Sequence, residues 1–353
     1  MEQTIIDHKI PKNELDFGSD NENMESENSD DDNIPLKKFV EDEPENIIKK
    51  KIIKTQPINP IIGNRPLTDY IFANVNNYSF KTWQQCFPDN KIKLRSLIFN
   101  SAWYEFFDIV EKKAYFKRME SILSDYLSKS DEIILPYAEL VFNILNILSP
   151  KQIKVVICGQ DPYPGVNKIN DKLIPQAMGF SFSVPLNYPK PDSLKNIYEN
   201  LFEFGHISKI PDNGCLSFWV LQGCFMMNAT FTTFYTKKNV HRNLWKCFTD
   251  DLLAYINMKC KNIVFVAWGK DAHILCQNID PYKHHIITSS HPSPLGYEKT
   301  FSGFAYGKFK NLKDRKMVTY PSFKSTDHFG RINNYLKSIN KTEIIWNLIE
   351  QNY

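Results

Sequence analysis

The chain has 353 residues, of which 42% are hydrophobic and 24% charged, and its formal net charge is +3. This length and composition are typical of a globular protein with one large domain or two smaller ones. No apolar stretch is long enough to span a membrane, which argues against a transmembrane protein.

The charge is unevenly distributed along the chain. The first 46 residues hold 15 Asp or Glu and 4 Lys or Arg, a net charge of −11, so the other 307 residues carry +14. The acidic segment is rich in Asn and Ser and cannot bury enough apolar surface to offset the entropy cost of ordering. We expect residues 1–64 to be a disordered acidic tail of unknown partner, and residues 65–353 to form one domain.

A lysine-rich stretch, residues 49–54, follows the acidic segment. It fits a nuclear-import or nucleic-acid-binding signal, or an incidental run of lysines, because short basic motifs are frequent. The surplus of positive charge in the rest of the chain favours a polyanionic partner such as nucleic acid. A basic surface that serves only solubility would have the same composition.

Four short apolar segments, residues 155–158, 224–227, 263–268 and 285–288, each end at a Gly or a polar residue and predict buried strands. Apolar residues recur with helical spacing in 194–202 and 244–256, and Ser193 is a candidate N-cap. Strands that alternate with helices predict a parallel sheet with right-handed crossovers. We therefore expect an α/β fold of three layers, α/β/α, with a central, mostly parallel four-stranded sheet.

Polar residues follow three of these strands, namely Asp161, Asn228 and His291. The carboxyl ends of parallel strands meet at one edge of the sheet, where ligands bind in open α/β folds. We therefore expect the three side chains to converge on an active site. Each also has a purely structural interpretation, because Asp and Asn are frequent in turns and a His can hold a Pro-rich loop in place.

Seven cysteines are scattered along the chain without a Cys-x-x-Cys motif or a Cys/His set at zinc spacing. We expect no metal and no cofactor. The odd number of cysteines and the absence of a signal peptide indicate a reducing, intracellular environment. Cys158, Cys224 and Cys260 lie in or beside apolar runs and are expected to be core residues.

Several segments, in this order, resemble the uracil-DNA glycosylases of family 1: 159–163, 177–185, 189–198, 222–233 and 291–295. Gly-Gln-Asp-Pro-Tyr at 159–163 matches the first five positions of the family's water-activating loop, Gly-Gln-Asp-Pro-Tyr-His. The family's His-Pro-Ser-Pro-Leu loop is complete at 291–295. The resemblance extends from about residue 134 to the C-terminus and fades before Arg65.

The resemblance implies a monofunctional hydrolase for base-excision repair. Such an enzyme flips uracil out of single- or double-stranded DNA, cleaves its N-glycosidic bond and leaves an abasic site. A monomer is expected, in the nucleus or another DNA-containing compartment, or at a cytoplasmic replication site if the protein is viral. An iron–sulfur type of glycosylase is not supported, because the chain has no cysteine cluster.

Cleavage of the N-glycosidic bond of deoxyuridine produces positive charge on the sugar and negative charge on the departing uracil. The resemblance assigns Asp161 to the sugar and the attacking water, and His291 to the uracil O2. It assigns Gln160 and three further residues to the base: Tyr163 excludes the thymine methyl group, Phe182 stacks on the ring, and Asn228 reads its edge. Aromatic residues in apolar runs, such as Phe182, are otherwise usually core residues.

The resemblance also implies DNA contacts. Pro189, Pro191, Ser193 and Ser293 would approach backbone phosphates, which positions the duplex without reading its sequence. Leu295 resembles the apolar residue that enters the base stack as the base leaves. A buried loop leucine is an alternative interpretation of Leu295.

The chain departs from the family pattern at several places. Pro164 replaces the His that usually follows the Tyr, Gly296 stands where Ser is common, and residues 166–175 lengthen one interval. Residues 297–324 are expected to form an extended loop. These departures leave open a second hypothesis, a DNA-binding accessory or processivity module with weak or no catalysis. The intact Asp161, Asn228 and His291 favour the enzyme.

Overall fold

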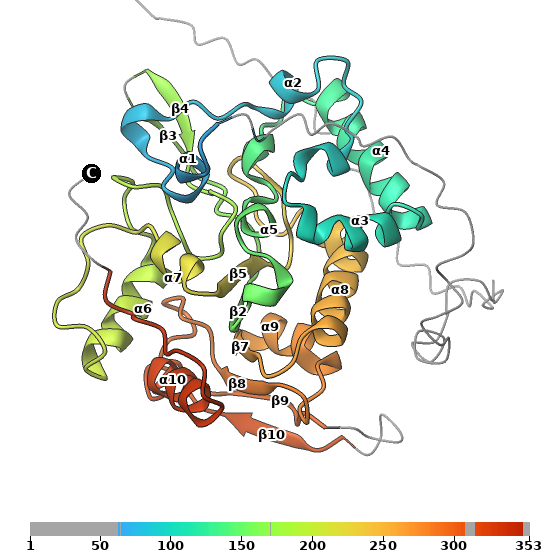
Figure 1. Ribbon diagram of the computed structural model, residues 1–353. Helices are drawn as coiled ribbons and strands as arrows, with labels where there is room; N and C mark the ends of the chain where they lie inside the picture. Colours follow the sequence, from blue (N-terminus) through green and yellow to red (C-terminus); the bar gives the residue numbers. More distant parts are fainter. Residues whose placement is uncertain (1–62, 64, 170, 308–314, 349–353) are drawn as a thin grey trace, which may run out of the picture. The chain divides into compact units, whose positions relative to one another are not determined.

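A four-stranded parallel sheet with strand order β5-β2-β7-β8 lies at the centre of the fold (Figure 1). Its strands are β2 (Val155–Gly159), β5 (Cys224–Asn228), β7 (Val264–Trp268) and β8 (His285–Ser289). In the register, Gly159 pairs with Asn228 and Trp268 pairs with Ser289. The carboxyl ends of the strands therefore lie at one edge, and the prediction of a parallel four-stranded sheet is confirmed.

The computed structural model describes residues 63, 65–169, 171–307 and 315–348, all within the unit Pro57–Tyr353. The predicted acidic tail and the lysine-rich stretch 49–54 lie outside the described residues, except for residue 63 at the end of the tail.

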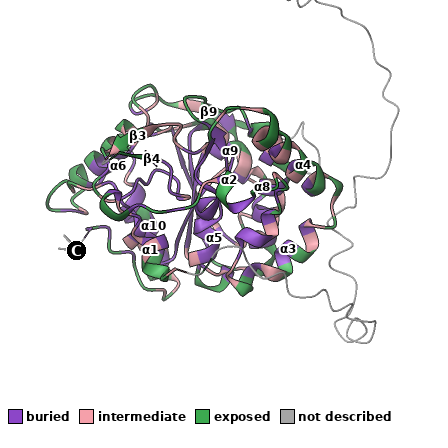
Figure 2. Cartoon of the chain, turned by 90° about the horizontal axis from the view of Figure 1, so that it is seen from above, coloured by how far each residue is buried: buried purple, intermediate pink, exposed green. Residues whose placement is uncertain are grey.

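Helices cover both faces of the sheet, which confirms the three-layer α/β/α architecture. Figures 1 and 2 place α6 and α10 on one face and α3, α4 and α8 on the other. Their bounds are α3 (Tyr104–Val110), α4 (Ala114–Lys129), α6 (Asp192–Glu203), α8 (Arg242–Lys259) and α10 (His328–Ser338).

The two central strands, β2 and β7, are buried along their whole length, which explains why they appear in the sequence as uninterrupted apolar runs. Aromatic rings fill the layer between α3, α8 and the sheet. Phe106 meets Phe248 edge-on with ring centroids 5.4 Å apart, and Trp103 lies 5.7 Å from Phe225 of β5. This dense packing gives the sheet a rigid base on which loops can be positioned.

Short elements complete the fold. The helices are α1 (Leu67–Ile71), α2 (Trp83–Cys86), α5 (Asn143–Ile147), α7 (Ser217–Leu221) and α9 (Gly269–Leu275). The 3-10 turns are Val75–Asn77, Leu94–Leu97, Ser101–Trp103, Ala138–Leu140, Pro150–Gln152 and Cys276–Asn278. β1 (Ile134–Leu135) pairs antiparallel with β6 (Thr233–Phe234).

Two antiparallel hairpins occupy segments in which the sequence departs from the family pattern. β3 (Val166–Ile169) and β4 (Lys172–Pro175) form the first. β9 (Phe301–Phe304) and β10 (Met317–Tyr320) form the second, inside the segment expected to be an extended loop. The Phe301 and Tyr320 rings stack with centroids 5.2 Å apart, which stabilises the pairing of these strands.

The predicted helices at 194–202 and 244–256 correspond to α6 and α8. The prediction that Ser193 caps α6 is wrong, because the helix begins at Asp192 and Pro191 is its N-cap. The Pro191 carbonyl accepts hydrogen bonds from the backbone N–H groups of Leu194 and Lys195, both at 3.0 Å. Ser193 thus lies inside the first turn, where its hydroxyl makes no capping bond.

Candidate active site

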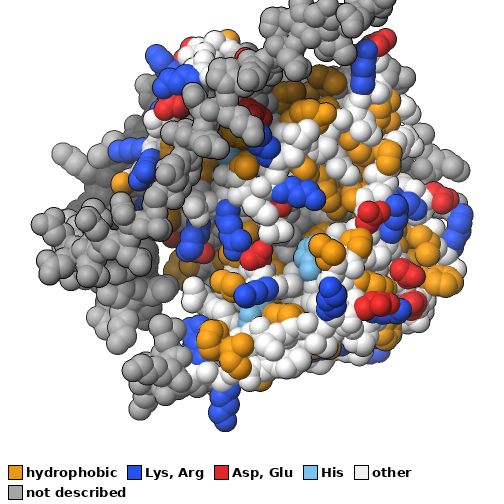
Figure 3. Space-filling model, turned by 180° about the vertical axis from the view of Figure 1, so that it is seen from behind, with side chains coloured by type: hydrophobic (Ala, Val, Ile, Leu, Met, Phe, Trp, Pro, Cys, Tyr) orange, Lys and Arg blue, Asp and Glu red, His pale blue; other side chains and the backbone are white. Residues whose placement is uncertain are grey.

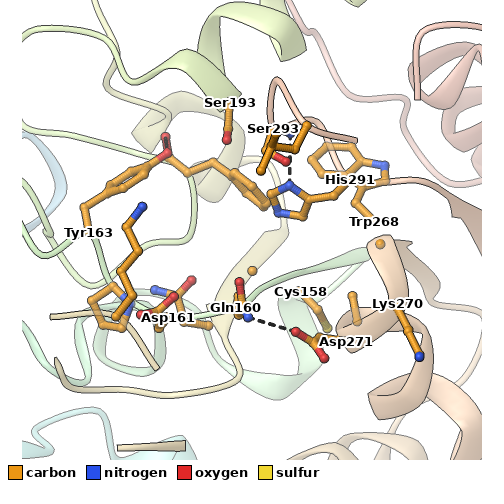
Figure 4. A pocket seen from close by; sticks show the side chains of 18 of the residues that line it. Cys158, Gln160, Asp161, Tyr163, Ser193, Trp268, Lys270, Asp271, His291 and Ser293 are labelled. Carbon is orange, nitrogen blue, oxygen red and sulfur yellow. Dashed lines mark hydrogen bonds between the residues drawn. The ribbon is translucent and has the colours of Figure 1, made fainter. Parts of the chain in front are cut away.

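A cavity of about 420 Å³ opens at the carboxyl ends of β2, β5 and β7, beside the loop that follows β8 (Figure 4). Nine residues predicted from the sequence line it: Gln160, Asp161, Tyr163, Phe182, Ser193, Asn228, His291, Ser293 and Leu295. The structure therefore brings together residues that are 135 positions apart in the chain, from Gln160 to Leu295. Pro189 and Pro191 do not line the cavity. Pro189 is exposed, and Pro191 is the N-cap of α6.

Gly159 allows β2 and β5 to place their last residues against each other. A Cβ atom at Gly159 would lie 2.3 Å from Oδ1 of Asn228 and 2.7 Å from Cβ of Ser181. Any larger residue would displace the Asn228 amide, so the end of β2 must be a glycine. Within the described residues the Asn228 side chain has no hydrogen-bond partner, and its amide is available to a ligand.

Asp161 is held in the loop after β2 by a backbone donor. Its Oδ2 accepts a hydrogen bond of 2.9 Å from the N–H of Asn239. Burial raises the pKa of the Asp161 carboxyl, whereas the Asn239 N–H and the charge of Lys238 lower it. Asp271, a further carboxylate at the cavity, acts in the same direction as burial. One oxygen of Asp161 is thus fixed while the carboxylate lines the cavity.

His291 presents a neutral ring to the cavity. Its Nδ1 accepts a hydrogen bond of 3.0 Å from the backbone N–H of Ser293. Because a backbone amide can only donate, the neutral ring carries its proton on Nε2. Burial lowers the His291 pKa to about 4, so the ring is neutral at pH 7. The site therefore holds a neutral Nε2–H donor rather than an imidazolium ion.

Gly269, at the start of α9, packs directly against His291. Its φ angle is +88°, and a Cβ atom there would lie 2.9 Å from Cβ of His291. Both the backbone conformation and the space require glycine. The chain thus brings the end of β7 close enough to fix the position of the His291 backbone.

Aromatic side chains form one wall of the cavity. Phe182 has a left-handed backbone with φ of 62°, which is rare for a residue with a bulky side chain. Its ring centroid lies 5.5 Å from that of Trp268 and 5.9 Å from that of His291. The Tyr163 hydroxyl donates to the Phe182 carbonyl at 3.4 Å. The uncommon backbone at Phe182 is held by this packing and directs the ring towards the cavity.

Leu295 is 81% exposed at the rim of the cavity. The alternative interpretation of Leu295 as a buried loop leucine is therefore wrong. The loop that carries it is anchored by the Asn196 side chain of α6, which donates to the Pro292 carbonyl at 2.7 Å.

Comparisons with known proteins assign the chain to one family. The family model described as the uracil DNA glycosylase superfamily matches residues 146–337, more than half of the chain. The chain belongs to the uracil DNA glycosylase superfamily. This confirms the resemblance that the sequence segments indicate.

Relatives in the superfamily align over most of the chain. A protein of Acanthamoeba polyphaga mimivirus named "Probable uracil-DNA glycosylase" is 52% identical over 290 residues, 82% of this chain and 76% of the relative. The uracil-DNA glycosylase of Pseudomonas paraeruginosa is 35% identical over 261 residues, 74% of this chain and 97% of the relative. A crystal structure of mimivirus uracil-DNA glycosylase has a TM-score of 0.76 and 53% identity, and the match covers 81% of this chain and all of that one.

Three polar residues at or beside the cavity were not predicted from the sequence: Lys238, Arg242 and Asp271. Asp271 accepts a hydrogen bond of 2.8 Å at Oδ2 from Nε2 of Gln160 (Figure 4). Its other oxygen accepts one of 2.8 Å from Arg242. Lys238 also lines the cavity. An available signal was the predicted strand 263–268, which ends at the same edge of the sheet and so indicates residues 269–271.

Within the described ranges, no group of three or more His, Cys, Asp or Glu side chains is arranged to hold a metal ion. In the same part of the chain, none of the helices has both the length and the apolar character needed to cross a membrane.

Proposed function

We propose that this chain is a uracil-DNA glycosylase, which extrudes uracil from DNA and hydrolyses its N-glycosidic bond to leave an abasic site. The observation that carries the proposal is that Asp161, a neutral His291 and the unpaired Asn228 amide line one cavity of about 420 Å³, a volume typical of small-molecule sites. The membership of the superfamily and the relatives' names support the same activity.

His291 suits the task of stabilising the departing uracil. As the glycosidic bond breaks, negative charge develops on the uracil O2, and a hydrogen-bond donor stabilises that charge. The Ser293 N–H fixes the tautomer with the proton on Nε2, the atom left free for the substrate. A donor that is already oriented in a largely water-free site contributes about 10²–10³ in rate.

Asp161 is suited to stabilise the positive charge that develops on the sugar as the glycosidic bond breaks. A carboxylate near this cation stabilises it and can orient the attacking water, as carboxylates do in glycoside hydrolysis. The hydrogen bond from the Asn239 N–H leaves the other Asp161 oxygen for these tasks. Because one oxygen is already bound, little reorganisation is needed in the transition state.

The remaining lining residues account for selection of uracil. The Asn228 amide offers one donor and one acceptor, which match the uracil O4 and N3–H, whereas cytosine presents the opposite pattern. Such a mismatch leaves buried polar groups unpaired and can discriminate by about 10⁴–10⁵. Phe182 would stack on the base. The partly buried ring of Tyr163, with Gln160 close to it in the chain, would occupy the space that a thymine methyl group needs.

Contacts with DNA follow from residues at the rim. The exposed Leu295 would enter the base stack when the base leaves, and Ser193 and Ser293 would approach phosphates, with Pro189 and Pro191 nearby. We propose single- or double-stranded uracil-containing DNA as the substrate and a monomer as the active form. The site of action would be a DNA-containing compartment: the nucleus, or the cytoplasm for a virus that replicates there.

The direct test is release of uracil from a labelled oligonucleotide in the presence of EDTA. We expect release from the uracil strand and none from matched strands with thymine or cytosine. The Asp161→Asn variant, purified in parallel, controls for contaminating activity. Absence of release, or release that requires a divalent ion, would contradict the proposed function.

A further inference from the structure

The loop that follows β6 is held by hydrogen bonds from three of its backbone N–H groups, two of which join it to the cavity-lining residues Pro164 and Asp161. The N–H of Tyr235 donates to the Ile133 carbonyl, and the N–H of Thr236 donates to the Pro164 carbonyl, both at 2.9 Å. The N–H of Asn239 donates to Oδ2 of Asp161. Thr236 and Asn239 both have left-handed backbones, with φ of 62° and 61°. Lys238 is thus carried by a loop whose backbone is fixed relative to Asp161.

Lys238 lines the cavity, yet in the described part of the chain its ammonium group makes no hydrogen bond and no ion pair. Its neighbour Lys237 differs, because its Nζ pairs with Glu132 across 2.5 Å. An ammonium group left free beside a ligand cavity is available to an anionic part of the ligand, whereas one that is already paired is not.

The other basic side chains around the cavity have different positions or partners. Lys270 also lines the cavity, but Figure 4 shows its side chain extending away from the labelled catalytic residues. Arg242 is paired with Asp271, and the ring of His291 is neutral. On the face shown in Figure 3, lysine and arginine side chains are spread among acidic and apolar ones rather than gathered into a single patch. Lys238 therefore differs from the other basic residues by its position at the cavity and its lack of a partner among the described residues, not by belonging to a basic surface patch.

Asp161 lies among several charged and polar groups. Lys238 and the Asn239 N–H favour its carboxylate form, and Asp271 of α9 opposes it. His291, on the loop after β8, is neutral and adds no charge. Pro164, on the same loop as Asp161, has neither an N–H group nor a polar side chain. Lys238 is consequently the cation that acts on Asp161 among the groups that face it in the described structure.

We propose that Lys238 is a substrate-contact residue of this chain, whose ammonium group binds a DNA phosphate beside the extruded nucleotide and serves as counter-charge to the Asp161 carboxylate. The inference rests on the proposed function and adds to it a residue that is not part of the loops resembling the family. A phosphate is the group that DNA presents at the mouth of such a cavity, and lysine binds it as a point charge.

The test compares Lys238→Ala with Lys238→Arg, and uses Lys237→Ala as the matched control on the same loop. Each phosphate contact contributes about 0.9 to the slope of log K against log salt for duplex DNA. Lys238→Ala should lower this slope by about 1. It should also shift the acid limb of the pH profile of kcat/KM to higher pH, because the Asp161 carboxylate loses a favourable charge. Lys238→Arg should retain both properties, and Lys237→Ala should change neither.

Two results would overturn the inference: an unchanged salt slope for Lys238→Ala, or an acid limb that does not move while the fold is intact by thermal unfolding. Equal effects of Lys237→Ala would show general surface charge and would also overturn it. If the wild-type chain releases no uracil in EDTA, the proposed function is wrong and this inference falls with it. If the wild type is active and only the Lys238 variants behave otherwise than expected, the inference alone is wrong.

Discussion

The two edges of the central sheet each carry a cavity, and their comparison shows what makes one of them a site. The cavity at the carboxyl edge measures about 420 Å³ and the one at the amino edge about 580 Å³. The amino-edge cavity is lined by residues that precede β2 and β5, among them Lys154 and Gln222, and by Lys341 and Thr342 from the segment after α10. Of these two cavities, the one at the amino edge is the larger, so volume does not distinguish the proposed site.

The hydrogen-bond partners of the two edges differ. At the amino edge, Lys154 donates to the Thr342 carbonyl at 3.1 Å, and Lys341 donates to the Asn262 carbonyl at 3.0 Å. Gln222 exchanges two hydrogen bonds with the backbone of Ile345. At the carboxyl edge, the Asn228 amide and the His291 Nε2 have no partner among the described residues. Groups that the fold itself leaves unpaired are the ones that a ligand can satisfy.

The largest expected difference between the edges is in the rate of uracil release. Asp161→Asn and His291→Leu should each lower the single-turnover rate by about 10²–10³ or more, because each removes one electrostatic contact to the transition state. Lys341→Ala, at the amino edge, should keep the wild-type rate. Thermal unfolding of each variant checks the fold. Near-normal rates for both carboxyl-edge variants would contradict the catalytic assignment.

Base preference gives the next largest effect. Asn228→Asp should admit cytosine, because a carboxyl group can match its amino donor, and Tyr163→Ala should admit thymine by opening space for the methyl group. Excision from matched oligonucleotides with uracil, cytosine or thymine measures the change. If both variants still release uracil alone, the proposed pocket is wrong.

The buried histidines should make stability depend on pH. The pKa of His291 is lowered to about 4 by burial, as is that of His241, so each binds fewer protons in the folded state than when unfolded. Their contribution is fully present above about pH 6.5 and is lost as the pH falls towards 4, by at most about 3 kcal/mol for each group. Denaturant unfolding at pH 7.5 and pH 5 measures the loss.

His291→Leu sharpens this experiment, because leucine cannot take up a proton. The variant should lose less stability than the wild type between pH 7.5 and pH 5. Equal losses in the two proteins would show that His291 is not held in the neutral state by the fold.

The smallest expected effect concerns the acidic tail. Deletion of residues 1–46, which carry a net charge of −11, should preserve the cleavage step and modestly tighten DNA binding at low salt, because this negative charge competes with DNA for the positively charged remainder of the chain. Binding constants at two salt concentrations, with single-turnover rates, test this expectation. An unchanged affinity would indicate a solvated tail without effect, and loss of cleavage in a folded truncation would place the tail in the catalytic domain.

Features that depend on burial or on local spacing could be predicted from the sequence. β2 and β7 are buried on both faces and therefore appear as uninterrupted apolar runs, and parallel order then places Asp161, Asn228 and His291 at one edge. Assignment of chemical roles to these residues required the resemblance, since a turn Asp and a loop His have the same local pattern.

Features that depend on contacts between distant residues could not be predicted from the sequence. The ion pair of Arg242 with Asp271 joins positions 29 apart, and no helical or strand period encodes it. Asp271 lies in the first turn of α9, where acidic residues are common in helices, so its position alone does not indicate a functional role. The β9–β10 hairpin depends on the pairing of Phe301 with Tyr320, which lies outside any local pattern.

The claim that the unpaired groups of the carboxyl edge form the base site is tested most directly by a structure of the chain with free uracil. We predict uracil in the 420 Å³ cavity, against the Phe182 ring and within hydrogen-bond distance of the Asn228 amide and of Nε2 of His291. Uracil bound at the amino edge beside Lys154 and Lys341, or bound in the carboxyl-edge cavity without contact to Asn228 and His291, would contradict the account.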